Sequence, residues 1–257
     1  HDADIECGDA ELQRAIRFGL FHLMQAAPSK GTAVIGARGL TGPAYRGHVF
    51  WDADAFVLPF LAATHPASAR AMLRYRSQHI GAARRNAESS GYRGARFPWE
   101  SAGRGVDVTP VAARDRSGQV RAIHTGALEV HVVADVAWAA QHYIDWTDDE
   151  AFAQGPGHKL LVETARFWAS RARRSSEHRA HVFGVIGPDE YHDPVDDNAF
   201  TNVMARSNLQ WAIASAMRVG DIPSHEVETW HALAEHLVDG FDPARGCLLY
   251  TSPSPET

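Results

Sequence analysis

The chain has 257 residues, of which 45% are hydrophobic and 22% charged, and its formal net charge is −6. That is the composition of a globular protein with room for one large core or two small ones. A slightly acidic chain lacks the basic excess that a nucleic-acid surface needs, and no stretch approaches the roughly 20 apolar residues of a membrane span. We therefore expect neither nucleic acid nor a membrane as a partner.

The N-terminus is acidic, lacks a signal-peptide pattern and has no starting methionine, so we expect a fragment of a longer protein. The two cysteines, Cys7 and Cys247, make no disulfide framework. Both observations favour a reducing, cytoplasmic location.

The spacing of apolar residues predicts about seven helices and almost no strands. The first covers residues 9–27, where Leu12, Ile16 and Leu20 recur at helical spacing before Pro28 ends the run. Gly155-Pro156-Gly157 is interpreted as a break before a later helix. The remaining helices are expected at about 51–64, 67–89, 127–146, 158–174, 198–219 and 224–238. Weak strand signals occur only at 32–35 and 181–186.

Two long glycine-rich connections, residues 28–49 and 91–125, separate some of these helices. Long loops are usually functional or disordered, and loops that carry tryptophan are seldom disordered. Short and long connections alternate, which favours stacked helix pairs. The short turns would then lie at one end of the stack, and the long loops would gather at the other end as a site.

Two loop stretches place a tryptophan beside an acid. Trp51-Asp52 stands at a loop-to-helix junction, and Trp99-Glu100 follows Pro98. This pairing suits a sugar site, because the indole packs on the apolar face of a pyranose and the carboxylate accepts hydrogen bonds from hydroxyls. The alternatives stay open: Trp51 could be core, Asp52 a helix cap and Trp99 a loop anchor.

A third stretch, Asp189-Glu190-Tyr191-His192, directly follows Gly187-Pro188. Proline lacks an N–H and clashes with the preceding turn, so a Gly-Pro pair is not expected inside a helix. The two acids should therefore stand on a connection, where catalytic groups are often displayed. An ordinary polar loop is the alternative.

Other chemistries leave no signature. The chain has 15 histidines but no HExxH motif and no Cys/His cluster with ligand spacing, so we expect no metal. His124 and His131 are seven residues apart and do not make a convincing pair. The phosphate loop, the dinucleotide fingerprint and the GxSxG nucleophile elbow are also absent.

Together, residues 38–52, 91–102 and 187–202 resemble glycoside hydrolase family 65, and the resemblance extends over about residues 4–245. That family contains inverting maltose, trehalose and kojibiose phosphorylases and a few trehalose-type hydrolases. Its catalytic domain is an all-α (α/α)6 barrel of twelve helices, preceded by a β-sandwich. The resemblance implies that residues 1–246 are the first part of such a barrel, with about seven of its helices and the site at the long-loop end.

The resemblance also implies roles for single residues. Glu190 matches the general acid, while Trp51 and Asp52 match the pair that holds the non-reducing glucose. Residues 124–131 correspond to a loop that helps to choose the acceptor sugar, and here they look most like the kojibiose-type members. The substrate-binding residues that it implies are Trp51, Asp52, Trp99, Glu100, Tyr191 and His192.

The implied reaction is inverting phosphorolysis of an α-glucosyl disaccharide of the kojibiose, trehalose or maltose type. Glu190 would protonate the glycosidic oxygen, so its pKa should be raised by partial burial or by a neighbour such as Asp189. Inorganic phosphate would attack from the opposite face and give β-glucose 1-phosphate, with phosphate as co-substrate and no cofactor.

Other functions stay open at this point. They are trehalase-type or glucoamylase-like hydrolysis, in which a second carboxylate activates water, and an inactive carbohydrate-binding fragment. In the family, the phosphate-binding loop lies in a later part of the barrel than this chain reaches. The sequence therefore does not separate phosphorolysis from hydrolysis.

Residues 247–257 depart from the family, and we expect a non-native tail that packs poorly and has no function. The fragment should expose apolar surface where later helices would dock and should have little activity alone. For the full-length protein we allow for a homodimer.

Overall fold

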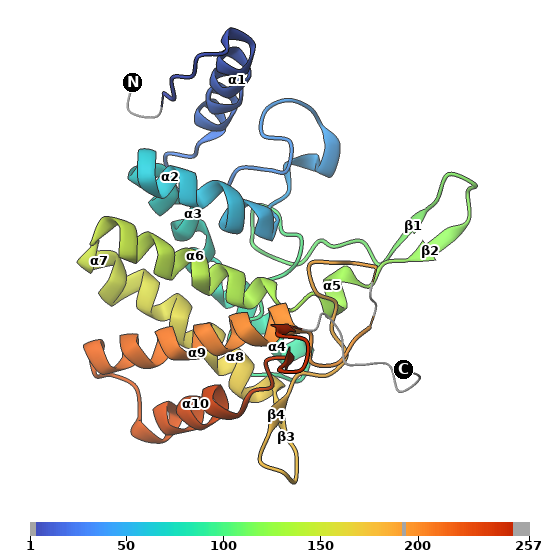
Figure 1. The fold of residues 1–257 in the computed structure, drawn as a ribbon, viewed down its shortest axis with the longest axis vertical. Helices are drawn as coiled ribbons and strands as arrows, with labels where there is room; N and C mark the ends of the chain where they lie inside the picture. The colour runs from blue at the N-terminus through green and yellow to red at the C-terminus, as the bar shows by residue number, and fades with distance from the viewer. Residues whose placement is uncertain (1–3, 192–193, 249–257) are drawn as a thin grey trace.

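The computed structural model describes residues 4–191 and 194–248, which are built mainly of helices (Figure 1). The described strands form three separate two-stranded antiparallel hairpins, so helix packing builds the core. The α-helices are α1 (Ala10–Ala26), α2 (Leu58–Thr64), α3 (Pro66–Gln78), α4 (Ile80–Ser89), α5 (Thr125–Leu128), α6 (Val132–Thr147), α7 (Glu150–Phe152), α8 (His158–Arg171), α9 (Ala199–Val219) and α10 (Ser224–His236). The strands are β1 (Ala112–Arg114), β2 (Val120–Ala122), β3 (Arg173–Arg174), β4 (Ala180–His181), β5 (Phe241–Asp242) and β6 (Cys247–Leu248).

Helix α6 lies at the centre and packs on α2 and α3 on one side and on α8 and α9 on the other. Its sequence is apolar on most sides, as expected of a largely buried helix, although Asp145 and Trp146 near its end are exposed. Val132 and Val136 join a cluster with α2 and α3, while Val133 and Ala137 join a second cluster with α8, α9 and α10. Alanines along α6 let these neighbours approach closely.

Short and long connections lie at opposite ends of the helix stack, as the sequence predicted. In Figure 1 the short links from α6 to α7 and from α9 to α10 lie at the left, while the loop leading to α5 and the β1–β2 hairpin lie at the right. All six residues of β1 and β2 are exposed. The segment 91–125, expected to be a plain connection, thus carries a protruding hairpin.

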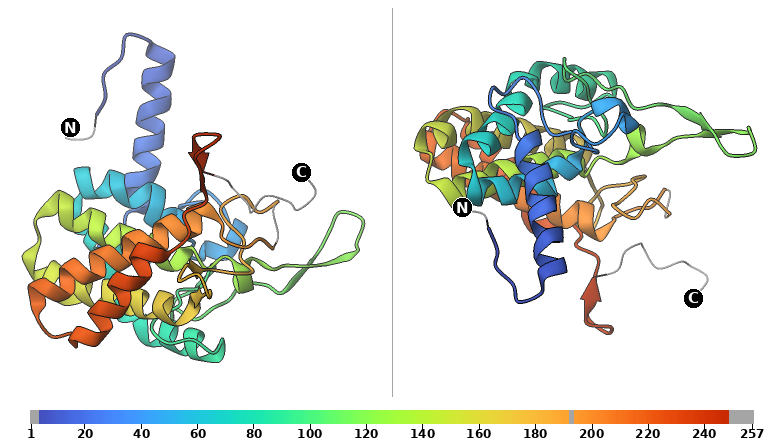
Figure 2. Two further views of the ribbon diagram at one scale, coloured as in Figure 1. Left: turned by 60° about the horizontal axis from the view of Figure 1, so that its bottom comes forward. Right: turned by 90° about the horizontal axis from the view of Figure 1, so that it is seen from above.

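Helix α1 forms where its apolar spacing predicts it, and Asp9 caps it by accepting hydrogen bonds from the backbone N–H groups of Glu11 and Leu12. Yet it has no buried residue and projects from the body (Figures 1 and 2). Leu12, for example, is 52% exposed. The amphipathic pattern determines this helix, and at its C-terminal end Met24 and Ala26 are partly buried against the core cluster around α2, α3 and α6.

Two predicted helices are interrupted. The helix expected at 67–89 divides at His79, whose ring hydrogen-bonds the Tyr75 carbonyl (2.9 Å) and packs against Gly105. The helix expected at 127–146 divides into α5 and α6 at Glu129, which has φ −79° and ψ 71°. This break turns the Leu128 carbonyl outward to accept the backbone N–H of Ile186 (3.1 Å).

The prediction of a break at Gly155-Pro156-Gly157 is wrong, because Ala153–Gly157 form a π-helical turn that continues into α8 with Pro156 inside it. A wider turn tolerates the missing N–H. The two predicted strands also differ from the structure. Residues 32–35 are irregular, and of residues 181–186 only His181 belongs to a strand, β4. The helix predicted to reach residue 174 ends at Arg171, and Arg173–Arg174 form β3, which pairs with β4.

The predicted non-native tail is described only at its start. Cys247 and Leu248 form β6, pair with β5 and are exposed, and residues 249–257 lie outside the described residues. Its foreign origin stays a prediction. At the α9–α10 edge of the bundle, Met217 is 76% exposed beside a groove of about 410 Å³.

Candidate active site

The first two sequence stretches are joined by backbone hydrogen bonds, although about fifty residues separate them. Val49 and Ser101 exchange both bonds, at 2.8 and 3.0 Å. From α3, the Tyr75 hydroxyl donates to the Ala102 carbonyl (2.6 Å) and lies 3.1 Å from the Ser101 hydroxyl. The Trp99-Glu100 loop is therefore held against the segment that leads into Trp51-Asp52.

Glu100 is buried and its side chain has a fixed partner. Its Oε1 lies 2.5 Å from the Nδ1 of His48, and both side chains are largely shielded from solvent. The Glu100 carbonyl also accepts the N–H of Val108 (3.0 Å). His48 was not among the predicted site residues, since nothing in its sequence position indicates a partner 52 residues away.

Aromatic rings connect these segments. Phe50 packs edge-to-face on Trp99, with 4.9 Å between ring centroids, and on Tyr45, at 5.3 Å. Tyr45 and Arg46 adopt φ of 57° and 54°, in the left-handed region that such residues seldom occupy. Strained backbone of this kind persists where the surroundings hold it and is frequent at functional sites.

The loop that carries Glu190 is held at its start. The Ile186 N–H donates to the Leu128 carbonyl, and Gly187 lies against the Asn198 side chain so closely that an added Cβ would meet it at 2.4 Å. Asn198 in turn caps α9 by accepting the Thr201 N–H (3.0 Å). Only glycine fits at 187, and the Gly-Pro pair stands on a connection, as predicted.

The three stretches meet at one cavity of about 680 Å³. Trp99, Glu100 and Glu190 all line it, so three of the predicted residues converge. The base of the β1–β2 hairpin forms another part of its wall. The lining residues are Tyr45, Arg46, His48, Trp99, Glu100, Val108, Pro110, Ile123, Thr125 and Glu190.

The pKa of the Glu190 carboxyl is raised above its ordinary value, first by partial burial and then by the negative charges of Glu129 and Asp52. The sequence predicted a raised value from burial or from Asp189. Burial is the larger cause, but the carboxylates that act are Glu129 and Asp52, brought close by the fold. A carboxyl that keeps its proton at higher pH suits proton donation.

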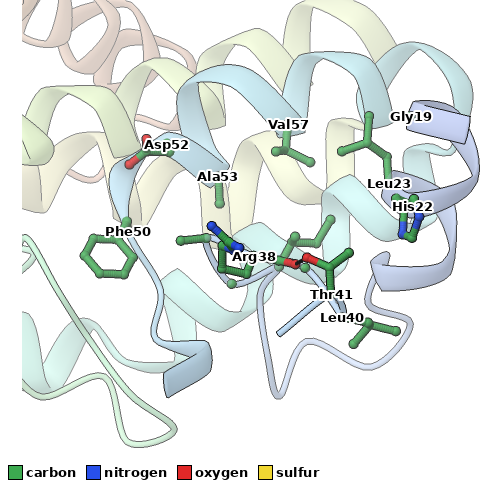
Figure 3. Close-up of a pocket in the computed structure, with 14 residues that line it drawn as sticks. Gly19, His22, Leu23, Arg38, Leu40, Thr41, Phe50, Asp52, Ala53 and Val57 are labelled. Atoms are coloured by element: carbon green, nitrogen blue, oxygen red, sulfur yellow. Dashed lines mark hydrogen bonds between the residues drawn. The ribbon is translucent and has the colours of Figure 1, made fainter. Parts of the chain in front are cut away.

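Asp52 does not cap the helix that it begins, because its side chain makes no capping hydrogen bond; that alternative is wrong. It is exposed and lines a second cavity of about 380 Å³, with Phe50 near it and Gly19 and His22 of α1 at the other end (Figure 3). Trp51 is half-buried, packs on the α2–α3–α6 cluster and meets the His131 ring edge-to-face at 5.0 Å.

The last two predicted residues are not placed at the cavity. Tyr191 is 97% exposed and is absent from the lining, and its N–H donates to Asp189 (3.1 Å). His192 lies outside the described residues. Across residues 4–191 and 194–248, no group of three or more His, Cys, Asp or Glu side chains is arranged to hold a metal ion. The helices of this same part include none long and apolar enough to cross a membrane.

Comparison with known proteins places the chain among carbohydrate-active enzymes. Residues 17–248 match the model of the glycosyl hydrolase family 65 central catalytic domain. The kojibiose phosphorylase of Caldanaerobacter subterraneus subsp. tengcongensis is 42% identical over 238 residues, which are 92% of this chain and 30% of that protein. The kojibiose hydrolase of Flavobacterium johnsoniae is 38% identical over 237 residues, 92% of this chain and 33% of that protein.

A solved structure gives the same result at the level of the fold. It is provisionally assigned as a kojibiose phosphorylase from the human microbiome, and it matches with a TM-score of 0.78 and 26% identity. The match covers 90% of this chain and 34% of that one. The chain thus spans about a third of the length of the relatives that it matches.

Proposed function

Because the chain belongs to glycosyl hydrolase family 65, we propose that the full-length protein carries out inverting phosphorolysis of an α-glucosyl disaccharide. The products would be β-glucose 1-phosphate and the acceptor sugar. Identity of 42% to a kojibiose phosphorylase favours kojibiose over trehalose or maltose as the substrate. Inorganic phosphate would be the co-substrate, with no further cofactor.

The observation that carries this proposal is the meeting of Trp99, Glu100 and Glu190 on one cavity. The indole N–H of Trp99 is buried and has no hydrogen-bond partner in the described protein, so a sugar hydroxyl could accept from it. Glu100, oriented by His48, would accept from another hydroxyl. Glu190, with its raised pKa, would protonate the glycosidic oxygen.

We assign Trp51 and Asp52 to the non-reducing glucose together with this group. Asp52 acts on the charge state of Glu190, which supports a place near the reacting centre. We further propose Tyr191, whose side chain is exposed, and His192 as substrate-binding residues. In the inverting mechanism, phosphate attacks the face of the ring opposite to Glu190.

The helices are proposed to be part of an (α/α)6 barrel, with residues 1–246 as its first part and about seven of twelve helices present. The TM-score of 0.78 over 34% of a longer relative supports this arrangement. The exposed Met217 and the adjoining groove between α9 and α10 lie where a further helix could pack.

Hydrolysis is the second candidate, because a kojibiose hydrolase is 38% identical over nearly the same residues. A hydrolase needs a second carboxylate to activate water, whereas a phosphorylase does not. Trehalase-type or glucoamylase-like hydrolysis would need that second carboxylate as well. An inactive carbohydrate-binding fragment would catalyse neither reaction.

The test is an assay of the full-length protein on kojibiose, trehalose and maltose with and without inorganic phosphate. We expect phosphate-dependent release of glucose 1-phosphate, with the β-anomer identified by NMR. Glucose released without phosphate would establish hydrolysis instead. Failure to turn over any of the three sugars would contradict both candidates, and residues 1–257 alone should show little or no activity.

A further inference from the structure

A buried histidine lies between two buried acids beside the proposed site. The Nδ1 of His131 is 2.7 Å from Asp135 Oδ2, and its Nε2 is 3.4 Å from Glu129 Oε2. All three residues are almost completely inaccessible to solvent. Isolated buried charges are costly, so such groups are normally paired. The sequence patterns did not predict this cluster of paired, buried groups.

The His131 ring contacts segments from two of the three sequence stretches. It meets the Trp51 ring edge-to-face at 5.0 Å and the Phe200 ring, in the first turn of α9, at 5.5 Å. A rotation of the imidazole would therefore displace Trp51 on one side and the start of α9 on the other. Its position couples elements that the chain brings together only on folding.

Glu129 is tied to the loop that carries Glu190. It directly follows Leu128, whose carbonyl accepts the Ile186 N–H at the start of that loop (3.1 Å). On the other side, the Arg96 guanidinium donates to the carbonyls of Gly126 and Ala127, both at 2.7 Å. These bonds hold the backbone next to Glu129 against the start of the loop that carries Glu190.

The charge of the cluster can be assigned. Burial opposes charging of His131, but the hydrogen bond to Asp135 and the Glu129 carboxylate 3.4 Å from Nε2 outweigh it and raise the pKa of His131 to about 9. The other charged groups near the cluster are Asp54 and Arg76, which act on Asp135 and are paired with each other. The Nε2 of this imidazolium lies 3.4 Å from one oxygen of Glu129, Oε2, while the other, Oε1, is buried with no partner among the described residues.

We propose that Glu129 and His131 are positioning residues of the reaction: His131 fixes the Glu129 carboxylate, whose negative charge holds the donor proton on Glu190. This inference rests on the proposed function, in which Glu190 is the general acid. It adds that, besides burial, a neighbour held by a buried imidazolium favours the protonated form of the acid, and that the same imidazolium orients Trp51. The negative charge of Glu129 stands among the causes that raise the pKa of Glu190, while His131 lowers it.

The test measures kcat/KM against pH for the full-length protein acting on its disaccharide. Activity requires protonated Glu190, so it falls on the alkaline side. In Glu129→Gln we expect this alkaline limb to move to lower pH, because a negative charge near Glu190 is gone. At pH values above the limb, kcat/KM should fall about tenfold for each pH unit by which the limb moves. With α-glucosyl fluoride, which needs no proton, the loss should be much smaller.

His131→Gln should act on both substrates, because it also releases Trp51. A misplaced positioning group can cost on the order of 10²-fold. Glu129→Asp retains the charge, so its alkaline limb should stay at the wild-type pH even if its rate falls. It also serves as the informative variant if Glu129→Gln does not fold.

Glu163→Gln is the matched control. Glu163 is another buried glutamate with two partners, Arg84 and Arg166, and it does not line the cavity. Its substitution should leave the alkaline limb where it is. The inference is overturned if Glu129→Gln slows both substrates equally at every pH, or if Glu129→Asp moves the limb as far as Glu129→Gln. A wild-type protein without turnover would instead overturn the proposed function, and the inference with it.

Discussion

Two glutamates show how differently the helix bundle and the loop end treat a carboxyl group. Glu163, on α8, lies between the guanidinium groups of Arg84 and Arg166, each at 2.7 Å, and these bonds lower its pKa against the opposing effect of burial. For Glu190, at the loop end, burial and then the charges of Glu129 and Asp52 raise the pKa and outweigh the opposing charge of His131. The first arrangement stabilises the helices, and the second prepares a proton donor.

The two regions differ in whether their buried charged and polar groups have protein partners. Between α4, α8 and α10 the ions form a continuous chain, since Arg166 also pairs with Glu226 (2.7 Å). At the loop end, Glu129 Oε1 and the indole N–H of Trp99 have no protein partner among the described residues. Groups left incompletely paired are candidates for function, whereas fully paired ones are more often structural.

The largest expected effect is on turnover. Glu190→Gln in the full-length protein should retain the fold and sugar binding but lose on the order of 10²–10⁴-fold in kcat, the usual contribution of general acid catalysis. α-Glucosyl fluoride should be much less affected. If both substrates slowed alike, or the disaccharide reacted normally, Glu190 would not be the acid and Glu100 would be the next residue to test.

The next effect is on stability. Arg76 and Asp54 form an ion pair in which both side chains are 1% exposed. Arg76→Met should destabilise the protein by roughly 3–5 kcal/mol, because Asp54 would remain as an uncompensated buried charge. Chemical unfolding of the full-length protein measures this. The double variant Arg76→Met, Asp54→Leu should recover much of the loss, and a double variant as unstable as the single one would contradict the argument.

Glu163→Gln should lower stability and keep activity, whereas Glu190→Gln should keep the fold and lower activity. Loss of two charge-assisted hydrogen bonds should cost roughly 1–3 kcal/mol of stability, while kcat/KM at a temperature where the variant is folded should stay close to the wild-type value. A large loss of activity with unchanged stability would place Glu163 with the reactive end, and the contrast between the two glutamates would fail.

A smaller, graded effect concerns pH. The pKa of His131 is raised from 6.5 to about 9 on folding, so its contribution is fully present below about 6.5 and is lost as pH rises through about 9. Glu163 has a pKa below its ordinary 4.5, so its contribution is present above that value and is lost as pH falls through the lowered one. Unfolding midpoints across pH should show both declines. His131→Gln should remove the alkaline decline, and Glu163→Gln should weaken the acid one.

Local pattern was enough for much of this protein. Helical spacing located α1, α9 and α10 within a few residues, since each presents a periodic apolar face or a clear cap. Two short motifs indicated Trp99, Glu100 and Glu190 from the sequence alone, because an aromatic or a Gly-Pro break beside an acid is visible within a few residues. Alternating loop lengths also indicated that the long loops would gather at one end.

Tertiary structure decided the remainder, for reasons of distance along the chain. His48 and Glu100 are 52 residues apart, and the charges that raise the pKa of Glu190 belong to Glu129 and Asp52, which only folding brings near it. The break before α6 depends on a hydrogen bond from Ile186, and the π-turn at Pro156 depends on a wider helical geometry that no propensity encodes. Periodicity reports which face a segment buries, but partners, charges and the shape of a cavity arise from contacts between segments.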